Sequence, residues 1–379
     1  MGVASAVLGV LWALAQHDLK RLLAYHSVET IGIILMGLGV GALGATHHLP
    51  AVALLGYAGA LLHTLNHALF KSLLFLSAGV VVQATGTREI DRLGGLARRM
   101  PGTALAFLVG AAAIVGLPPF NGFVSEWLIF MGLVHAGRVG EGLQAAAALT
   151  AGLALTGALA LACFSKLFGA VFLGVARDDS LATPLRPEAG LVMPQYYLAA
   201  LCLAIGLLPL PAIAAAVRAA GLLLPGVPAL PAGTIPPEVA AAARLVSLLA
   251  LGLVVLVGLA WAARRLARAG NPRGTAPTWG CAYAAPTSRM QYSASSYAAP
   301  LLAAFGPISG SRSVRRGAGF RTHATDLVLD ALGARVWQRI GGAAARLRLL
   351  QSGGLRRYLI YVILSVLGLL LYLRSGVAP

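Results

Sequence analysis

Three residues able to carry protons stand one helical turn apart in a long apolar segment. His63, His67 and Lys71 occupy positions i, i+4 and i+8, so on a helix they share one face and climb about 12 Å. Histidine changes its charge near physiological pH, and a lysine near mid-bilayer costs at least about 2.5–3.5 kcal/mol to insert. The spacing predicts a ladder of protonatable groups. Two alternatives stay open: polar contacts between neighbouring helices, and haem or metal ligation by the two histidines.

The chain uses lysine very sparingly. Of its 29 lysine and arginine residues only three are lysines, namely Lys20, Lys71 and Lys166. Arginine does not give up its proton in a protein, whereas a desolvated lysine can. Because Lys71 and Lys166 lie within apolar runs, their identity favours groups that load and release protons. Lys20 follows Asp18 at an expected helix start, where membrane orientation alone would also explain it.

A helix break is predicted just before Glu126. The segment contains two glycines and two prolines, Gly116, Pro118, Pro119 and Gly122. Proline removes a backbone donor and fixes φ, and glycine loosens the chain, so the helix should be interrupted there. Irregular backbone at membrane depth survives only where it is buried in protein or lines a hydrated cavity. Glu126 is therefore a candidate proton-exchanging carboxylate. Capping the second half-helix is a compatible structural role.

Three further candidates are weaker. His26 and Glu29 lie one turn apart early in an apolar run, and Lys166 lies about two-thirds through another. Long side chains near helix ends can extend to the membrane surface. Proton transfer and a structural role therefore both remain open for His26, Glu29 and Lys20, while Lys166 is kept as a proton-transfer candidate.

The composition defines the elements that must hold these residues. The chain is 58% hydrophobic and 11% charged, with a mean hydropathy of +0.82, which is typical of an all-α polytopic membrane bundle. Cys163, Cys202 and Cys281 show no metal or disulfide spacing. About eight spans are expected, one of them discontinuous, near residues 3–15, 22–45, 51–82, 103–135, 143–175, 192–220, 237–263 and 357–374.

The positive charges predict the orientation of these spans. Basic clusters follow several spans, at Lys20/Arg21, Arg88–Arg99, Arg177–Arg186 and 264–357, and such clusters face the cytoplasm. Parity then requires residues 103–135 to cross only once, as a broken helix. Both chain ends, including the C-terminus, are expected on the external side of the cell (inner) membrane.

The second part of the chain is expected to be more varied. Residues 221–263 should form a proline-rich external connector and an additional span, after a first unit at 1–220. Residues 264–356 should be a basic cytoplasmic segment, irregular over 270–318, with an amphipathic surface helix over about 322–350. An anchoring span follows at 357–379. The net charge of +17 is concentrated in that segment, which favours anionic lipid rather than nucleic acid.

Several motifs resemble the antiporter-like subunits of respiratory complex I, multisubunit sodium/proton antiporters and membrane-bound hydrogenases. The motifs are Asp18–Ser27, the His63/His67/Lys71 helix and Leu117–Phe123. Further motifs favour the branch of hydrogenase-4 component B and formate hydrogenlyase subunit 3; they are His26–Glu29, Phe123–Leu128, Thr278–Tyr283 and Arg289–Tyr297.

The resemblance implies a fold and a mechanism. The family has two inverted half-repeats, each with a broken helix, and a polar axis at the membrane midplane. By motif position, His63, His67 and Lys71 belong to that axis, Glu126 to the terminal site and Lys166 to the following span. Residues 1–220 match the second half-repeat only, so we expect a truncated beginning or a split subunit.

The resemblance also implies function and partners. It indicates a proton-translocating subunit of a group-4-type hydrogenase or formate hydrogenlyase complex, without a cofactor or metal of its own. The ion moved would be H⁺, with Na⁺ as the alternative, while membrane and hydrophilic redox partner subunits carry the electron chemistry. The alternatives are a subunit of complex I or of a cation/proton antiporter, and a non-transporting membrane scaffold.

Overall fold

The computed structural model describes most of the chain. The described residues are 1–139, 144–177, 189–224, 235–268, 287, 290–309, 311–316, 319–324, 333–347 and 355–374. Several expectations lie outside them: the Thr278–Tyr283 motif, Cys281, Arg289, most of the connector and residues 325–332 of the expected surface helix. The chain divides into two compact units, Met1–Ala324 and Thr325–Pro379.

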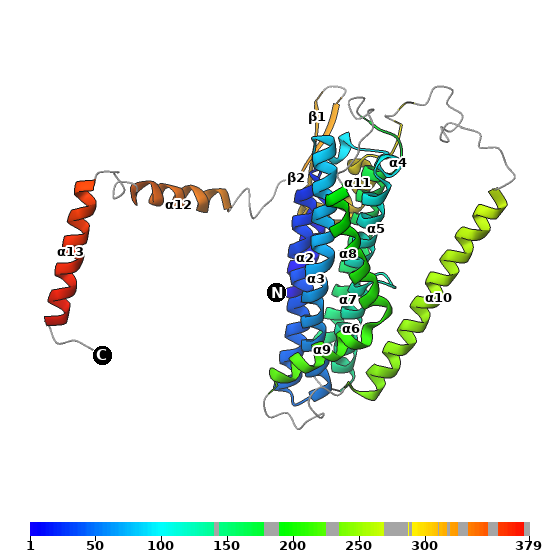
Figure 1. Ribbon diagram of the computed structural model, residues 1–379, viewed down its shortest axis with the longest axis horizontal. Coiled ribbons are helices and arrows are strands. Elements are labelled where there is room, and N and C mark those ends of the chain that lie inside the picture. The colour runs from blue at the N-terminus through cyan, green and yellow to red at the C-terminus, as the bar shows by residue number, and fades with distance from the viewer. Residues whose placement is uncertain are drawn as a thin grey trace. The chain divides into compact units, whose positions relative to one another are not determined.

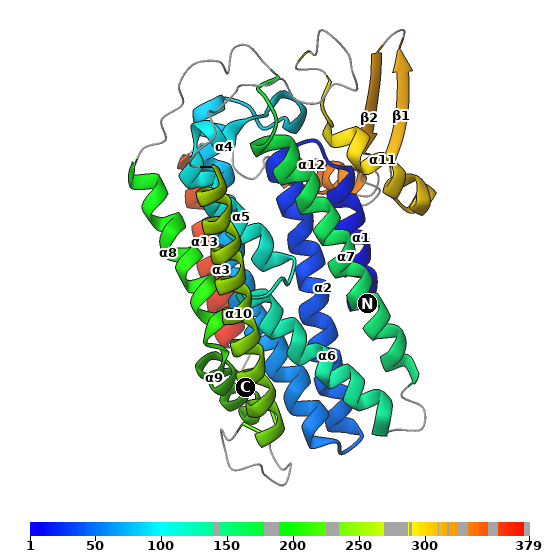
Figure 2. The ribbon, with the colours of Figure 1, turned by 90° about the vertical axis from the view of Figure 1, so that its right-hand side faces the viewer.

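The first unit is a helical bundle (Figures 1 and 2). Its most extensive packing joins α3 to α2, α5, α6, α8 and α9, so α3 is central. The bundle helices are α1 (Gly2–Ala15), α2 (Leu19–Thr46), α3 (Pro50–Thr85), α5 (Pro101–Ile114), α6 (Asn121–Val139), α7 (Gln144–Phe172), α8 (Ala189–Leu207) and α9 (Pro209–Leu222).

Local sequence sets the ends of the two central helices. Asp18 caps α2 by accepting a hydrogen bond of 2.9 Å from the Arg21 backbone N–H, which satisfies a donor left unpaired by helix geometry. In α3, Pro50 occupies the first turn, where its missing N–H costs nothing. The helix ends at Gly86, whose left-handed φ of 69° favours glycine. The long span carrying the ladder is thus defined locally at both ends.

The predicted helix break is confirmed. α5 ends at Ile114 and α6 begins at Asn121, and the peptide bond between Pro118 and Pro119 is cis. Gly116 adopts a left-handed φ of 71°, which glycine tolerates without steric cost. A Cβ atom on Gly122 would overlap the carbonyl oxygen of Ala113. Glycine at both positions therefore lets the two half-helices turn within a narrow space.

A second interruption was not predicted. Residues 192–220 were expected as one span, but α8 ends at Leu207 and α9 begins at Pro209. Leu208 has φ −121° and ψ 66°, because a residue preceding proline is disfavoured in the helical region. α10 (Pro237–Arg268) follows at the edge of the bundle, where it packs against α8 and α9.

Small elements gather at one end of the bundle, while α9 lies at the other (Figure 1). They are η1 (Ile90–Arg92), α4 (Leu96–Arg99), α11 (Ala294–Phe305), η3 (Gly306–Ser309) and the strands β1 (Ser311–Arg316) and β2 (Gly319–Ala324). The expectation of an irregular segment over 270–318 was wrong for its described part. A Ser293–Ser296 capping box starts α11. An antiparallel hairpin, which was not expected from the sequence, pairs Arg312 with His323.

The second unit contains α12 (Ala334–Leu347) and α13 (Leu355–Arg374). The expected amphipathic helix is present within α12. Its expected start at 322 was wrong, since Thr322–Ala324 belong to β2, where backbone pairing with β1 takes the place of helical hydrogen bonds. α13 corresponds to the expected anchoring span.

The helices have the length and surface of a multi-pass membrane protein. Among the described residues five helices are long and apolar enough to cross a membrane. They are Leu19–Thr46, Pro50–Thr85, Ala148–Phe172, Gly190–Leu207 and Pro237–Arg268. Large apolar side chains such as Leu65, Leu105 and Leu161 are exposed, as lipid contact requires.

Three of the basic clusters share one end of the bundle. The Leu19 backbone N–H donates to the Arg88 carbonyl at 2.8 Å, and Arg177 Nη1 donates to the Leu93 carbonyl at 2.7 Å. The starts of α2 and α4 and the end of α7 therefore lie together, as the parity argument requires.

Candidate functional site

Lys71 lies in the middle of α3 and points into the bundle. Its side chain is only 7% exposed, and Nζ has no hydrogen-bond partner among the described residues. Nζ lies over the ring of Phe75, 5.9 Å from its centroid. Glu29 on α2 is close enough to interact with it electrostatically. A buried amine with a carboxylate nearby but no fixed acceptor is suited to exchange a proton.

His63 is buried two turns before Lys71 and connects to the broken helix. Its Nδ1 lies 2.9 Å from Ser125 Oγ, which donates to the Gly122 carbonyl at 3.0 Å. Because a serine hydroxyl has a single proton, this assigns the proton of neutral His63 to Nδ1. Nε2, buried without a partner in the described part of the chain, is then free to accept a proton.

Two asparagines stabilise the same contact between α3 and the start of α6. Asn66 Nδ2 donates to the Asn121 carbonyl at 2.7 Å and to Ser125 Oγ at 3.0 Å. Asn121 Nδ2 donates back to Asn66 Oδ1 at 3.1 Å. All three side chains are buried, where satisfied hydrogen bonds give a fixed geometry. This network holds the start of α6 against α3 at the level of His63.

His67 occupies the turn between His63 and Lys71. It is less buried than either, and its Nε2 has no hydrogen-bond partner in the residues described. The Phe70 ring lies edge-on to it, with centroids 5.8 Å apart. The three members of the ladder thus lie on one side of α3, and His67 is the most exposed of them.

Glu126 lies one turn inside α6, and its carboxylate rests against the break. A Cβ atom built on Gly116 would lie 2.7 Å from Glu126 Oε2. The side chain is buried, and it interacts electrostatically with Glu29. The missing side chain at position 116 therefore creates the space that the carboxylate occupies.

His26 and Glu29 form a buried pair rather than extending to the membrane surface. His26 Nδ1 is hydrogen-bonded to Glu29 Oε2, and both side chains are at most 1% exposed. The His26 ring packs on Phe164 of α7 with centroids 4.6 Å apart. Glu29 interacts electrostatically with both Lys71 and Glu126. The His26–Glu29 pair on α2 is therefore coupled to α3 and to α6.

Lys166 is also buried, at 2% exposed, but its surroundings differ from those of Lys71. Its Nζ donates to the carbonyl oxygens of Leu14 at 2.6 Å and Gln16 at 3.1 Å. These carbonyls belong to the C-terminal end of α1, where the helix leaves acceptors unpaired. Lys166 therefore satisfies carbonyl oxygens at the C-terminal end of α1. It also interacts electrostatically with His26.

Lys20 is separate from these residues. It lies in the first turn of α2 and is partly exposed, beside the ion pair of Asp18 with Arg88 at 3.5 Å. Its position at the basic end of the bundle agrees with the orientation role considered for it.

Sequence reasoning missed Asn66, Asn121 and Ser125. Each is a short polar residue within an apolar run, beside a residue that was selected. A systematic search for polar residues on the buried face of α3 would have found Asn66. The partners across helices follow only from the tertiary structure.

The fold and the site define a class of membrane protein. Residues 1–153 match the family model described as "NADH:quinone oxidoreductase/Mrp antiporter, TM". Over this region the chain is similar to the antiporter-like membrane subunits. Lys71, Glu126 and the broken helix lie within the matched region.

Individual relatives extend the match along the chain. Hydrogenase-4 component B of Escherichia coli is 37% identical, covering 98% of this chain and 58% of the relative. Formate hydrogenlyase subunit 3 of the same organism is 44% identical over 51% of this chain and 33% of its own length. The chain thus spans well under two thirds of these relatives.

One solved structure shows the same arrangement over nearly the whole chain. In the membrane-bound sulfane sulfur reductase, an archaeal respiratory membrane complex, one chain superposes with a TM-score of 0.62 at 25% identity. The superposition covers 97% of this chain and 55% of that chain.

Proposed function

We propose that this chain moves protons as a membrane subunit of a hydrogenase or formate hydrogenlyase type of complex. The hydrogenase branch is favoured over complex I and cation antiporters because the match to hydrogenase-4 component B extends over 98% of the chain. In this function the chain carries no redox chemistry itself. Membrane and hydrophilic partner subunits supply the electron transfer that drives proton movement.

The observation that carries the proposal is the buried amine of Lys71. Holding an ammonium ion in a low-dielectric interior is costly unless it is paired and hydrogen-bonded. Lys71 has a carboxylate within electrostatic range but no hydrogen-bond partner among the described residues. Such a residue is poorly explained as a helix-bonding group and well explained as a station that gains and loses a proton.

The neighbouring groups suggest a path. Glu126 at the broken helix and Lys71 on α3 both interact with Glu29, which in turn is bonded to His26. His63 and His67 extend the ladder along α3, and the Nε2 atoms of both rings have no hydrogen-bond partner among the described residues. Lys166 lies beyond His26 at the end of α1. We infer that protons pass among the two carboxylates, Lys71 and the ladder histidines and through water at the break, while Lys166 sets the local charge.

The orientation follows from charge. The basic end of the bundle, with Lys20, Arg88 and Arg177, faces the cytoplasm in this proposal, and the C-terminus lies outside. α12 lies along the membrane surface or a partner, and α13 anchors it. Cysteine labelling from either side of inner-membrane vesicles tests this arrangement.

The test of transport uses the assembled complex. Lys71→Ala and Glu126→Gln should abolish proton translocation while subunit assembly and electron transfer by the partners continue. Lys71→Arg should also fail, because arginine keeps the charge but does not release the proton. Ser72→Ala, at an exposed position of the same helix, is the matched control and should translocate normally.

The same experiment separates the rival readings. Normal translocation in both Lys71→Ala and Glu126→Gln, with intact assembly, would identify the chain as a non-transporting scaffold. Translocation that depends on sodium rather than on pH would favour the cation-antiporter alternative.

A further inference from the structure

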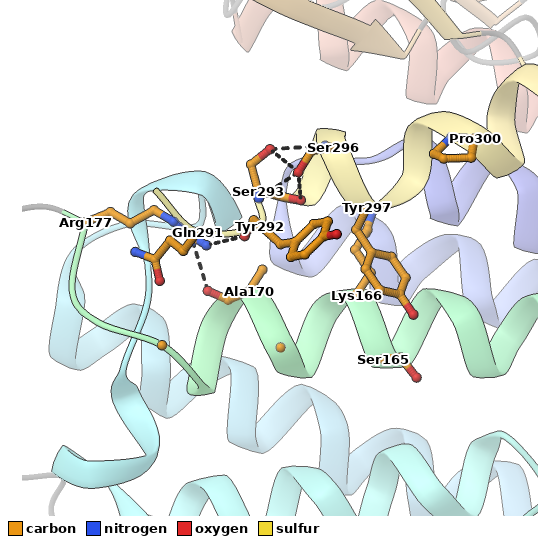
Figure 3. Close-up of a pocket in the computed structure, with 12 residues that line it drawn as sticks. Ser165, Lys166, Ala170, Arg177, Gln291, Tyr292, Ser293, Ser296, Tyr297 and Pro300 are labelled. Carbon is orange, nitrogen blue, oxygen red and sulfur yellow. Dashed lines mark hydrogen bonds between the residues drawn. The ribbon is translucent and has the colours of Figure 1, made fainter. Parts of the chain in front are cut away.

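A cavity of about 630 Å³ lies at the basic end of the bundle. Its walls come from the last turns of α7, the segment after α7 and the start of α11 (Figure 3). Lys166 and Arg177 lie toward different ends of it, and Tyr292 and Tyr297 lie between α11 and α7 (Figure 3). Proton transfer as proposed above does not require this cavity.

The cavity is lined by two cations, and its charge is only partly compensated. Its lining includes Lys166 and Arg177, and the described lining residues include neither aspartate nor glutamate. Lys166 donates to two carbonyl oxygens, so one of its three N–H groups is left over. Arg177 donates to the carbonyls of Leu93, Ala170 and Tyr292, which leaves two of its five donors. These acceptors are neutral. Asp91, which is not among the lining residues, interacts electrostatically with both cations, so one carboxylate faces two positive charges and the site keeps a net positive charge.

The remaining lining is that of a headgroup site. Hydroxyl groups of serine and tyrosine surround the two cations. Tyr292 is strongly exposed and Tyr297 partly so, and tyrosine is enriched where membrane spans meet the headgroup layer. The cavity lies at the end of α7, whose candidate membrane span ends at Phe172, and the ends of membrane spans lie close to the headgroup layer. Basic pockets between spans on the cytoplasmic side bind anionic lipid headgroups.

We propose that this cavity binds the phosphate headgroup of an anionic phospholipid, held between Lys166 and Arg177 beneath α11. The cavity volume of about 630 Å³ accommodates such a headgroup. Arg177 bridges α7, the α4 segment and the α11 segment. A phosphate beside it would therefore strengthen the attachment of α11 to the bundle.

The test fills the cavity without disturbing the fold. Gly169 lines the cavity, and a Cβ atom there would meet nothing within 4 Å. Gly169→Leu should therefore fold normally and exclude the headgroup. Gly157→Leu is the matched control, because Gly157 lies on the same helix, also faces open space and is not among the lining residues.

Native mass spectrometry of the full chain in detergent measures the binding. Wild type and Gly157→Leu should retain one cardiolipin or phosphatidylglycerol, whereas Gly169→Leu should bind it at least about tenfold more weakly. Arg177→Gln should weaken the binding of the anionic lipids and leave the weak binding of phosphatidylcholine unchanged.

Three results would overturn the proposal. One is unchanged binding in Gly169→Leu, and a second is equal retention of phosphatidylcholine by the wild type. The third is displacement of the bound lipid by millimolar inorganic phosphate, which would assign the cavity to a free anion instead.

Discussion

The two buried lysines of the bundle have opposite surroundings. Lys71 on α3 has no hydrogen-bond partner among the described residues and interacts with Glu29 only through space. Lys166 on α7 donates two short hydrogen bonds to the end of α1. Both are lysines within apolar helices of a chain that uses arginine for most of its positive charges, so the sequence made both candidates for proton transfer, with Lys166 the weaker one.

These surroundings predict that Lys71 exchanges its proton, whereas Lys166 keeps its positive charge. Carbonyl oxygens at the C-terminal end of a helix favour an ammonium group, and hydrogen bonds to a charged donor stabilise it by about 1.5–3 kcal/mol. Lys166 has this support and Lys71 does not. We therefore expect Lys71 to be the residue that releases protons, while Lys166 mainly positions α1 and sets the local charge near His26.

The largest expected effect concerns translocation. Lys71→Met should reduce proton uptake by the assembled complex in inner-membrane vesicles by at least about 100-fold, since it removes a proton-transferring group. Lys166→Met should cost less than about tenfold. Equal losses in the two variants would show that both lysines exchange protons and would remove the distinction drawn here.

Stability should change in opposite directions. Lys166→Met leaves the carbonyls of Leu14 and Gln16 without their donor and should lower the free energy of unfolding by about 2 kcal/mol. Lys71→Met removes a buried amine that lacks a partner, so stability should stay the same or rise. Reversible unfolding in mixed detergent micelles measures both. A loss of similar size in Lys71→Met would indicate an acceptor for its amine.

The break beside Glu126 offers a smaller, local test. Gly116→Ala places a methyl group where the Glu126 carboxylate lies and strains a left-handed φ, so we expect a loss of about 1–2 kcal/mol in stability and about a tenfold loss in translocation. Gly79→Ala is the control, because Gly79 in α3 has no neighbour within 4 Å of a Cβ atom. Normal translocation in Gly116→Ala would show that proton transfer does not depend on the position of the Glu126 carboxylate against the break.

The smallest effect is expected at Asp91, which lies in η1 outside the spans. Its carboxylate accepts a hydrogen bond from the first residue of α11. Burial alone would raise the pKa of the Asp91 carboxyl, but hydrogen bonds from His17 and from the Ala294 backbone N–H outweigh it. The pKa is therefore lower than in the unfolded chain. The resulting stabilisation is present above the unfolded value, about 3.9, and is lost as pH falls through the folded value.

Asp91→Asn should consequently lower stability by about 1 kcal/mol at neutral pH. The difference from wild type should shrink as pH falls below about 4. Thermal unfolding in detergent across this range measures it. A difference that does not change with pH would mean that the charge of Asp91 contributes nothing.

Much of the fold could be predicted because local chemistry dictates it. The two prolines and two glycines of residues 116–122 interrupt any helix, and the structure shows the break there. The capping residue Asp18 and the turn at Gly86 delimit α2 and α3. The interruption at Leu208 was also encoded, by Pro209, but a hydropathy run hides a single residue driven out of the helical region.

The rest depended on contacts between distant residues. The hairpin of β1 and β2 has no strong alternation of apolar residues, so only backbone pairing reveals it. The weak ranking of His26 and Glu29 rested on their place near a helix end. The structure buries both, because α7 covers that face of α2 through Phe164.

By itself the sequence determined that this is a membrane bundle with a histidine and lysine ladder and a broken helix, since helical periodicity, hydropathy and proline chemistry act over a few residues. Only the tertiary structure decided which buried lysine has acceptors. It also decided that Asn66, Asn121 and Ser125 fasten His63 to the break. The physical reason is that a buried polar group is defined by partners on other helices, and one helix's sequence does not contain them.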